Sequence, residues 1–123
     1  MNKEEIKKEL EELTGEFGNY PYGFFNILNS SNNPNIDFDT QNKGWESIKT
    51  EKWHSIDLSH YLLWAISDNG DLLWWNGEQT IAMNPRACEF MSLPVRPKQF
   101  MRLIGMGKVT GIFPPDLWEQ QNA

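Results

Sequence analysis

Two Asn-Gly dipeptides that enclose one short apolar run constrain the fold of this 123-residue chain more than any other feature. Asn69-Gly70 and Asn76-Gly77 flank the segment DLLWW, and apolar runs continue on both sides of the pair. Asn-Gly tolerates the positive φ angles of a type I′ turn, which joins neighbouring antiparallel strands. Residues 61–83 are therefore predicted to form three antiparallel strands joined by tight hairpins.

These predicted strands carry apolar side chains on both faces. Residues 61–66 are continuously apolar, which indicates a central strand that is covered on both sides. In the next strand Leu72 and Trp74 share one face, and Leu73 and Trp75 share the other. We expect a helix to cover one face of the sheet, whereas the other face is either packed or used for binding.

Helical periodicity is found near both ends of the chain. Apolar residues recur at helical spacing in a Lys- and Glu-rich background, which predicts an amphipathic helix over residues 3–13 that stops at Gly15. Pro97 is a suitable first residue of a second helix, and Gly105 is a suitable stop for it.

The remaining segments are predicted from composition and period. Residues 20–28 are aromatic and apolar and form either a strand or a short buried helix, and residues 29–35 form a loop. Residues 43–58 are consistent with two short strands or with a strand and a turn. Residues 85–91 are predicted as a fourth strand. The tail, residues 108–123, is predicted as a short strand, a Pro-Pro turn and a last helical turn.

Composition predicts a single cytoplasmic domain. A chain of 14.4 kDa is long enough for one core and too short for separate substrate and cofactor domains. Cys88 is the only cysteine, so no intramolecular disulfide is expected and a reducing cytoplasm fits best. The first residues lack the apolar run of a signal peptide. No stretch reaches the roughly 18 apolar residues that a membrane span needs.

The charge is negative and unevenly distributed. The net charge is −6 and the isoelectric point is about 4.8, so direct nucleic-acid binding is not expected, because phosphates would be repelled. Residues 16–89 hold ten acidic and four basic side chains, whereas residues 90–123 hold four basic and two acidic ones. The acidity therefore belongs to the middle of the chain.

Residues that could carry catalysis are few. His54 and His60 lie six positions apart with Asp57 between them, but no nucleophile motif accompanies them, and a structural role is the favoured interpretation. Cys88 is interpreted as a small buried hydrophobic residue. The carboxylates show no recognised ligand spacing, so no metal, cofactor or catalytic residue is predicted.

Four segments in order, GWES, WHSIDLSHYLLWAISDNGDLLWW, TIAMNPRACEFM and PKQFMRLI, resemble the core of the SUKH superfamily. This superfamily comprises small bacterial immunity proteins and relatives among the fungal cell-wall-assembly regulators. The similarity covers roughly residues 44–104, including a turn at Gly70 and Asp71. Members usually carry a Leu-Pro element and a helix ending in Asn-Gly, where this chain has PYGFFNILN followed by Ser30.

The resemblance implies an α+β fold, with a central antiparallel or mixed sheet and helices packed on it, over a single domain of residues 1–123. It also implies a non-enzymatic protein that neutralises a cognate toxin, often a nuclease. No catalytic residues carry over. The charge agrees independently, because nuclease toxins are basic and an acidic inhibitor gains association rate by opposing that charge.

The predicted partner-binding surface combines acidic and aromatic residues, with Trp64 in the core. We expect at least one of its tryptophans to be exposed beside one of its acids, although all of them could instead fill the core. Two other functions stay open: a small hydrolase-like enzyme using carboxylates and a histidine, and an intracellular scaffold or regulator. Neither the toxin nor the oligomeric state is predicted. The candidate surface residues are Trp45, Trp53, Asp68, Asp71, Trp74, Trp75 and Glu78.

Overall fold

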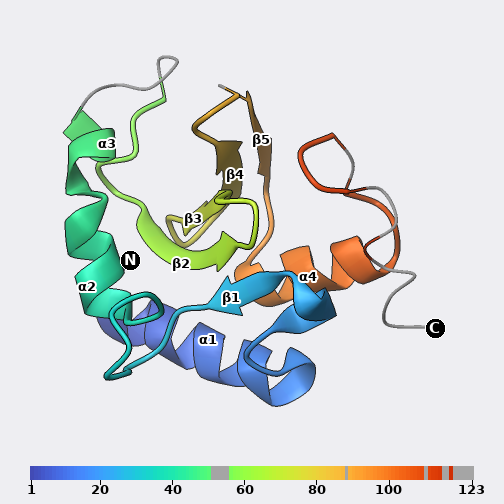
Figure 1. Cartoon of the computed structure of the whole chain (residues 1–123), viewed down its shortest axis with the longest axis horizontal. Helices are drawn as coiled ribbons and strands as arrows, with labels where there is room; N and C mark the ends of the chain where they lie inside the picture. The colour runs from blue at the N-terminus through green and yellow to red at the C-terminus, as the bar shows by residue number, and fades with distance from the viewer. Residues whose placement is uncertain (51–55, 88, 110, 115–116, 118–123) are drawn as a thin grey trace.

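The computed structural model describes residues 1–50, 56–87, 89–109, 111–114 and 117 (Figure 1). This part of the chain has the expected α+β fold, with a five-stranded antiparallel sheet in the order β1-β2-β3-β4-β5. Helices pack against the sheet, and all described elements share one hydrophobic core. The elements are α1 (Lys3–Phe17), the 3₁₀ helix η1 (Pro21–Gly23), β1 (Phe25–Ile27), α2 (Phe38–Gly44), α3 (Glu46–Thr50), β2 (Leu62–Ser67), β3 (Leu72–Trp75), β4 (Thr80–Asn84), β5 (Glu89–Leu93) and α4 (Pro97–Gly105).

The predicted three-stranded unit is confirmed. β2, β3 and β4 run antiparallel and turn at Asn69-Gly70 and Asn76-Gly77. The turns are not of type I′, because the glycines have positive φ angles, 84° at Gly70 and 100° at Gly77, and the asparagines do not. Asn76 contributes through its side chain instead, since its Oδ1 accepts the amide of Gln79 at 2.8 Å.

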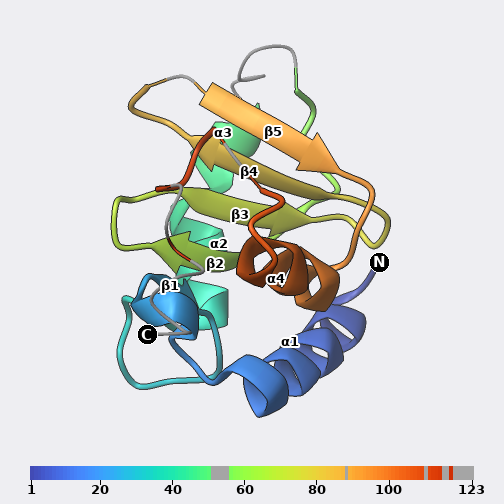
Figure 2. The same ribbon diagram turned by 90° about the vertical axis from the view of Figure 1, so that its right-hand side faces the viewer.

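Helices cover both faces of the sheet, with α4 on one side and α2 and α3 on the other (Figure 2). Phe100 of α4 contacts Trp64 edge to face, with ring centroids 6.2 Å apart. On the opposite side the ammonium of Lys49 in α3 lies 5.8 Å from the ring centroid of Trp74. The second face is therefore packed. β2 is covered on both sides as predicted, although the middle strand of the sheet is β3.

The first helix is longer than predicted. α1 continues through Gly15 and ends at Phe17, and Gly18 follows it with a φ angle of 79°. The Gly18 amide donates to the carbonyl of Thr14 at 2.8 Å. Gly18 ends the helix because glycine adopts this left-handed conformation without a steric penalty, whereas a glycine inside a helix only lowers its stability.

Residues 43–58 do not form the predicted short strands where the structure describes them, because α2 and α3 occupy much of this segment. Asp37 caps α2 by accepting the amide of Thr40 at 3.0 Å. The buried Asn42 then ties α2 to β2: its side chain donates to the Leu63 carbonyl at 2.9 Å and accepts the Leu63 amide at 2.8 Å. These polar contacts favour helix where apolar spacing alone suggested strands.

The other predicted elements have mixed outcomes. Residues 20–28 contain both predicted alternatives, because η1 precedes β1, and residues 29–35 form a loop. A fourth strand is present as β5, but it begins and ends later than the predicted range 85–91, because residues 85–87 form a turn. α4 has the predicted bounds. The short strand expected in the tail is absent from the described residues after α4. Within the described chain, no helix combines the length and apolar character needed to cross a bilayer.

Candidate protein-binding surface

Three of the residues predicted to face a partner belong to the interior. Trp74, Trp75 and Asp71 are 0, 3 and 1% exposed, so the prediction that they form a binding surface is wrong. For the two tryptophans the physical reason is that helices cover both faces of β3, so that alternate side chains of the strand are buried on both sides of the sheet. Trp64 lies in the core as expected.

The other predicted residues do not form one surface either. Asp68 and Glu78 are exposed, but they lie in consecutive hairpin turns, which are at opposite ends of β3. Trp45 is half-buried at the junction of α2 and α3. Trp53 lies outside the described residues. The structure therefore gives no described tryptophan that is exposed between the two acidic turns.

Asp71 has a structural position in the β2–β3 turn. The hydroxyl of Ser67 donates to Asp71 Oδ2 at 2.6 Å, and the Asp71 amide donates back to Ser67 Oγ at 3.0 Å. Asp71 Oδ1 is buried and has no hydrogen-bond partner among the described residues. Burial raises the pKa of Asp71 above its ordinary value of 3.8, although the Ser67 hydrogen bond and the charge of Arg86 oppose this shift. On the same turn, Asp68 accepts a hydrogen bond from the hydroxyl of Tyr20.

Three of the four basic side chains in residues 90–123 form ion pairs with glutamates of α1. The hydrogen bonds from Arg102 hold the pKa of Glu16 below its ordinary value of 4.5. By contrast, the exposed carboxylates of Asp68, Glu78 and Glu89 form no ion pair with any described residue. The pairs are Glu9–Arg96 at 3.4 Å, Glu12–Lys98 at 3.4 Å and Glu16–Arg102 at 2.7 Å.

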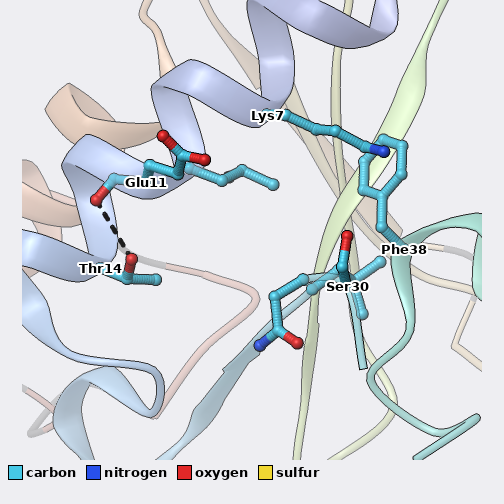
Figure 3. A pocket seen from close by; sticks show the side chains of 8 residues that line it. Lys7, Glu11, Thr14, Ser30 and Phe38 are labelled. Carbon is cyan, nitrogen blue, oxygen red and sulfur yellow. Dashed lines mark hydrogen bonds between the residues drawn. The ribbon is translucent and has the colours of Figure 1, made fainter. Parts of the chain in front are cut away.

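An open groove lies between α1, the end of β1 and the start of α2 (Figure 3). We call it the α1–α2 groove. Its volume is about 170 Å³. The floor consists of the buried side chains of Leu10, Leu28 and Phe38. The rim is polar and consists of Lys7, Glu11, Thr14, Asn29 and Ser30.

Of the two charged side chains on this rim, Lys7 and Glu11, the carboxylate of Glu11 is free of ion pairs with described residues. The ammonium of Lys7 lies 5.8 Å from the centroid of the Phe38 ring, a cation–π arrangement (Figure 3). Glu11 is exposed one helical turn after Lys7 and forms no ion pair with a described residue. The α1–α2 groove thus combines an apolar floor with an available negative charge.

Sequence reasoning missed the α1–α2 groove because its lining comes from three separate segments. The spacing of Lys7, Glu11 and Thr14 does place them along one face of α1, so the helical period contained part of the signal. Nothing in the sequence indicated that Leu28 and Phe38 would pack beneath that face.

A second hollow brings Trp75 next to acidic residues, although not to those predicted. It lies between α1 and the β3–β4 turn and has a volume of about 330 Å³. Lys8 and Arg96 also line it, so positive charges offset much of its acidity. Five of its seven lining residues are charged, so this hollow offers less apolar surface to a partner than the α1–α2 groove does. Its acidic residues are Glu5, Glu9 and Glu12.

The groups considered for catalysis are not assembled where the structure describes them. His60 shares an exposed hollow with Ser59 and Lys49, and no described carboxylate lines that hollow. His54 and Cys88 lie outside the described residues. The described residues contain no group of three or more His, Cys, Asp or Glu side chains that could hold a metal ion.

Comparison with protein-family models, with curated proteins and with solved structures finds no significant match to this chain. The fold itself defines the class: an α+β domain whose antiparallel sheet is covered by helices on both faces. Within that class, the α1–α2 groove is the candidate binding site.

Proposed function

We propose that this chain is a non-enzymatic immunity protein that acts in the cytoplasm and neutralises a basic protein toxin, with a nuclease domain as the expected target. The observation that carries the proposal is the α1–α2 groove, with its apolar floor and the open carboxylate of Glu11. Tight protein interfaces are commonly built from an anchor side chain in an apolar pocket with polar groups around it. An aromatic or aliphatic side chain of the toxin, next to a basic one, fits this groove.

The charge distribution supports the same kind of partner. Three of the four basic side chains in residues 90–123 form ion pairs with glutamates of α1, whereas Asp68 and Glu78 on the turns form no ion pair with described residues. A nuclease domain must be positively charged to hold nucleic acid. Opposite charge on the inhibitor accelerates association and disfavours wrong partners. The resemblance of residues 44–104 to the SUKH superfamily points to the same function.

The first test is protection. The chain is expressed together with a basic toxin domain encoded beside its gene, and growth of the cells is measured. We expect growth to be restored and the purified proteins to form a complex. A folded chain that neither restores growth nor binds the toxin domain contradicts the proposed function.

The second test locates the surface with a matched pair of variants. Glu11→Lys and Glu78→Lys both replace an exposed glutamate and both change the net charge by the same amount. Only Glu11 lines the α1–α2 groove. We expect Glu11→Lys to weaken toxin binding by about tenfold or more, mostly through faster dissociation, because it places a like charge at the contact. Glu78→Lys should only slow association at low salt.

The outcomes separate the function from its location. If Glu78→Lys weakens binding more than Glu11→Lys does, the toxin binds at the hairpin turns and not at the groove. If neither variant nor added salt alters binding, the acidic-surface mechanism is wrong even when protection is observed.

A further inference from the structure

β5 forms one outer edge of the sheet, and no described segment pairs with its outer side (Figure 2). All five of its residues pair with β4 in continuous register, from Asn84 opposite Glu89 to Thr80 opposite Leu93. The pairing of the strand is therefore regular along its whole length. Its outer backbone groups have the geometry that another strand needs for pairing.

Among the described residues, this edge has few of the features that usually prevent edge-to-edge pairing, the charged Glu89 at its start being the exception. Proteins protect edges with charged residues, above all lysine, and with proline, bulges or very short strands. β5 has five residues, contains no lysine or proline, and shows no register shift. β1, at the opposite edge, has only three residues. In addition, the apolar side chain of Phe90 in β5 is 46% exposed.

We propose that β5 pairs with the β5 strand of a second copy, antiparallel and about a two-fold axis at Met91. This register keeps side chains of the same face opposite each other, as a two-fold axis perpendicular to the sheet requires. It places Glu89 opposite Leu93, Phe90 opposite Ser92, and Met91 opposite its own symmetry mate. No like charges face each other within the strand pair, so this register has no repulsion between directly opposite side chains.

The same register accounts for the exposed aromatic ring. The two copies of Phe90 become diagonal neighbours across the axis, roughly 7–8 Å apart, which is within reach of aromatic side chains. Each ring then covers part of the other, and the two Met91 side chains meet on the opposite face. The result is one sheet that continues through both copies.

The first experiment measures self-association by sedimentation equilibrium of the purified chain. We expect a mass of twice 14.4 kDa at high concentration. Phe90→Lys introduces a lysine on this edge and should weaken the dimer by about tenfold or more. Gln99→Lys adds the same charge on the exposed side of α4 and should leave the dimer unchanged. Circular dichroism checks that both variants are folded.

The second experiment tests the register without relying on affinity. In a Cys88→Ser background, Met91→Cys is oxidised with oxidised glutathione. Directly opposite residues of antiparallel strands have Cα atoms about 4.5–5.5 Å apart, which a disulfide can span. We expect a covalent dimer for Met91→Cys and none for Gln99→Cys.

Two results overturn the proposal: a native chain that stays monomeric at all concentrations, or a dimer that Phe90→Lys does not weaken and that oxidised Met91→Cys does not cross-link. If the chain is monomeric and Phe90→Lys instead weakens toxin binding, the edge accepts a strand of the toxin and not a second copy.

Discussion

The carboxylate of Asp71 is buried in a turn that the sequence would place at the surface. It accepts the hydroxyl of Ser67, whose oxygen in turn accepts the amides of Asn69 and Asp71 at 3.2 and 3.0 Å. The side chain therefore organises the β2–β3 turn from inside. Burial disfavours the charge of this carboxylate and thereby raises its pKa.

Replacement of Asp71 should separate its hydrogen bond from its charge. Asp71→Ala removes the acceptor of the Ser67 hydroxyl and should lower the free energy of unfolding by about 1–3 kcal/mol. Asp71→Asn keeps an acceptor without the buried charge and should be more stable than the native chain at pH 7. A raised pKa means that the native carboxyl contributes most to stability below pH 3.8 and that this contribution is lost as the pH rises through its raised pKa.

Urea unfolding at several pH values tests this expectation. The advantage of Asp71→Asn over the native chain should vanish below pH 3.8 and grow above it. If Asp71→Asn is instead the less stable protein at neutral pH, the attraction of Arg86 outweighs the effect of burial.

Two glycines lie inside helices, Gly15 in α1 and Gly105 in α4, and the space around them differs. A Cβ at Gly15 of α1 would meet no atom within 4 Å. A Cβ at Gly105 of α4 would lie 2.5 Å from the hydroxyl oxygen of Tyr22. That hydroxyl is buried and donates to the carbonyl of Met101 at 2.7 Å, so it cannot move away freely.

Alanine at these two positions should have opposite effects. Gly15→Ala should raise the free energy of unfolding by about 0.5–1 kcal/mol, because alanine favours helix and loses less backbone entropy on folding. Gly105→Ala should lower it by about 1–3 kcal/mol, because the methyl group displaces Tyr22 and its hydrogen bond. Thermal unfolding of both variants provides the measurement. Equal stabilisation by the two changes would mean that Tyr22 adapts without loss.

At the scale of elements, the sequence predicts structure wherever local chemistry decides it. The hairpins at Asn69-Gly70 and Asn76-Gly77 and the bounds of α4 follow from turn glycines, apolar runs and a proline. α2 could not be predicted in this way, because it is tied to the backbone of β2 by Asn42, and Leu63 of that strand lies 21 residues further along the chain. The helix over residues 3–13 was predicted, but its end was placed at Gly15 instead of Phe17. A glycine ends a helix only where its own φ angle is positive, as at Gly18, and the sequence does not show which glycine that is.

For the whole molecule, Glu9 joins the two ends of the described fold. Its Oε2 accepts the amide of Lys98 in the first turn of α4 at 2.8 Å, and its Oε1 lies 3.4 Å from Arg96 Nε. The N-cap residue of α4, Arg96, makes no capping hydrogen bond with its own side chain. A buried carboxylate of α1 therefore caps another helix, in a position that also suits the helix dipole.

Loss of this cap should weaken the fold more than loss of a neighbouring ion pair. Glu9→Ala should lower the free energy of unfolding by about 1–3 kcal/mol, because a helix cap is lost and the Lys98 amide is left without its acceptor. Glu12→Ala, which removes the more exposed ion pair with Lys98, should lower it by less than about 1 kcal/mol. Urea unfolding at pH 7 compares the two, and similar losses would contradict a capping role for Glu9.

The α1–α2 groove is formed by segments that are far apart in the sequence, so the sequence did not predict it. The binding surface was predicted from tryptophans and acidic residues near the hairpins. Three of these residues are buried instead: Trp74, Trp75 and Asp71. The α1–α2 groove exists only after Phe38 and Leu28 pack beneath α1. No spacing within one segment encodes that packing.

The contact between Glu9 and Lys98 joins groups that lie 89 residues apart along the chain. At roughly 5–20 residues per second, a ribosome needs several seconds to make the second partner after the first. The hairpins of residues 61–83 involve short loops and can form during that delay. α1, in contrast, must wait with its buried face incompletely covered. Proteases and chaperones in the cell should therefore recognise α1 as the vulnerable segment of the nascent protein until α4 has emerged.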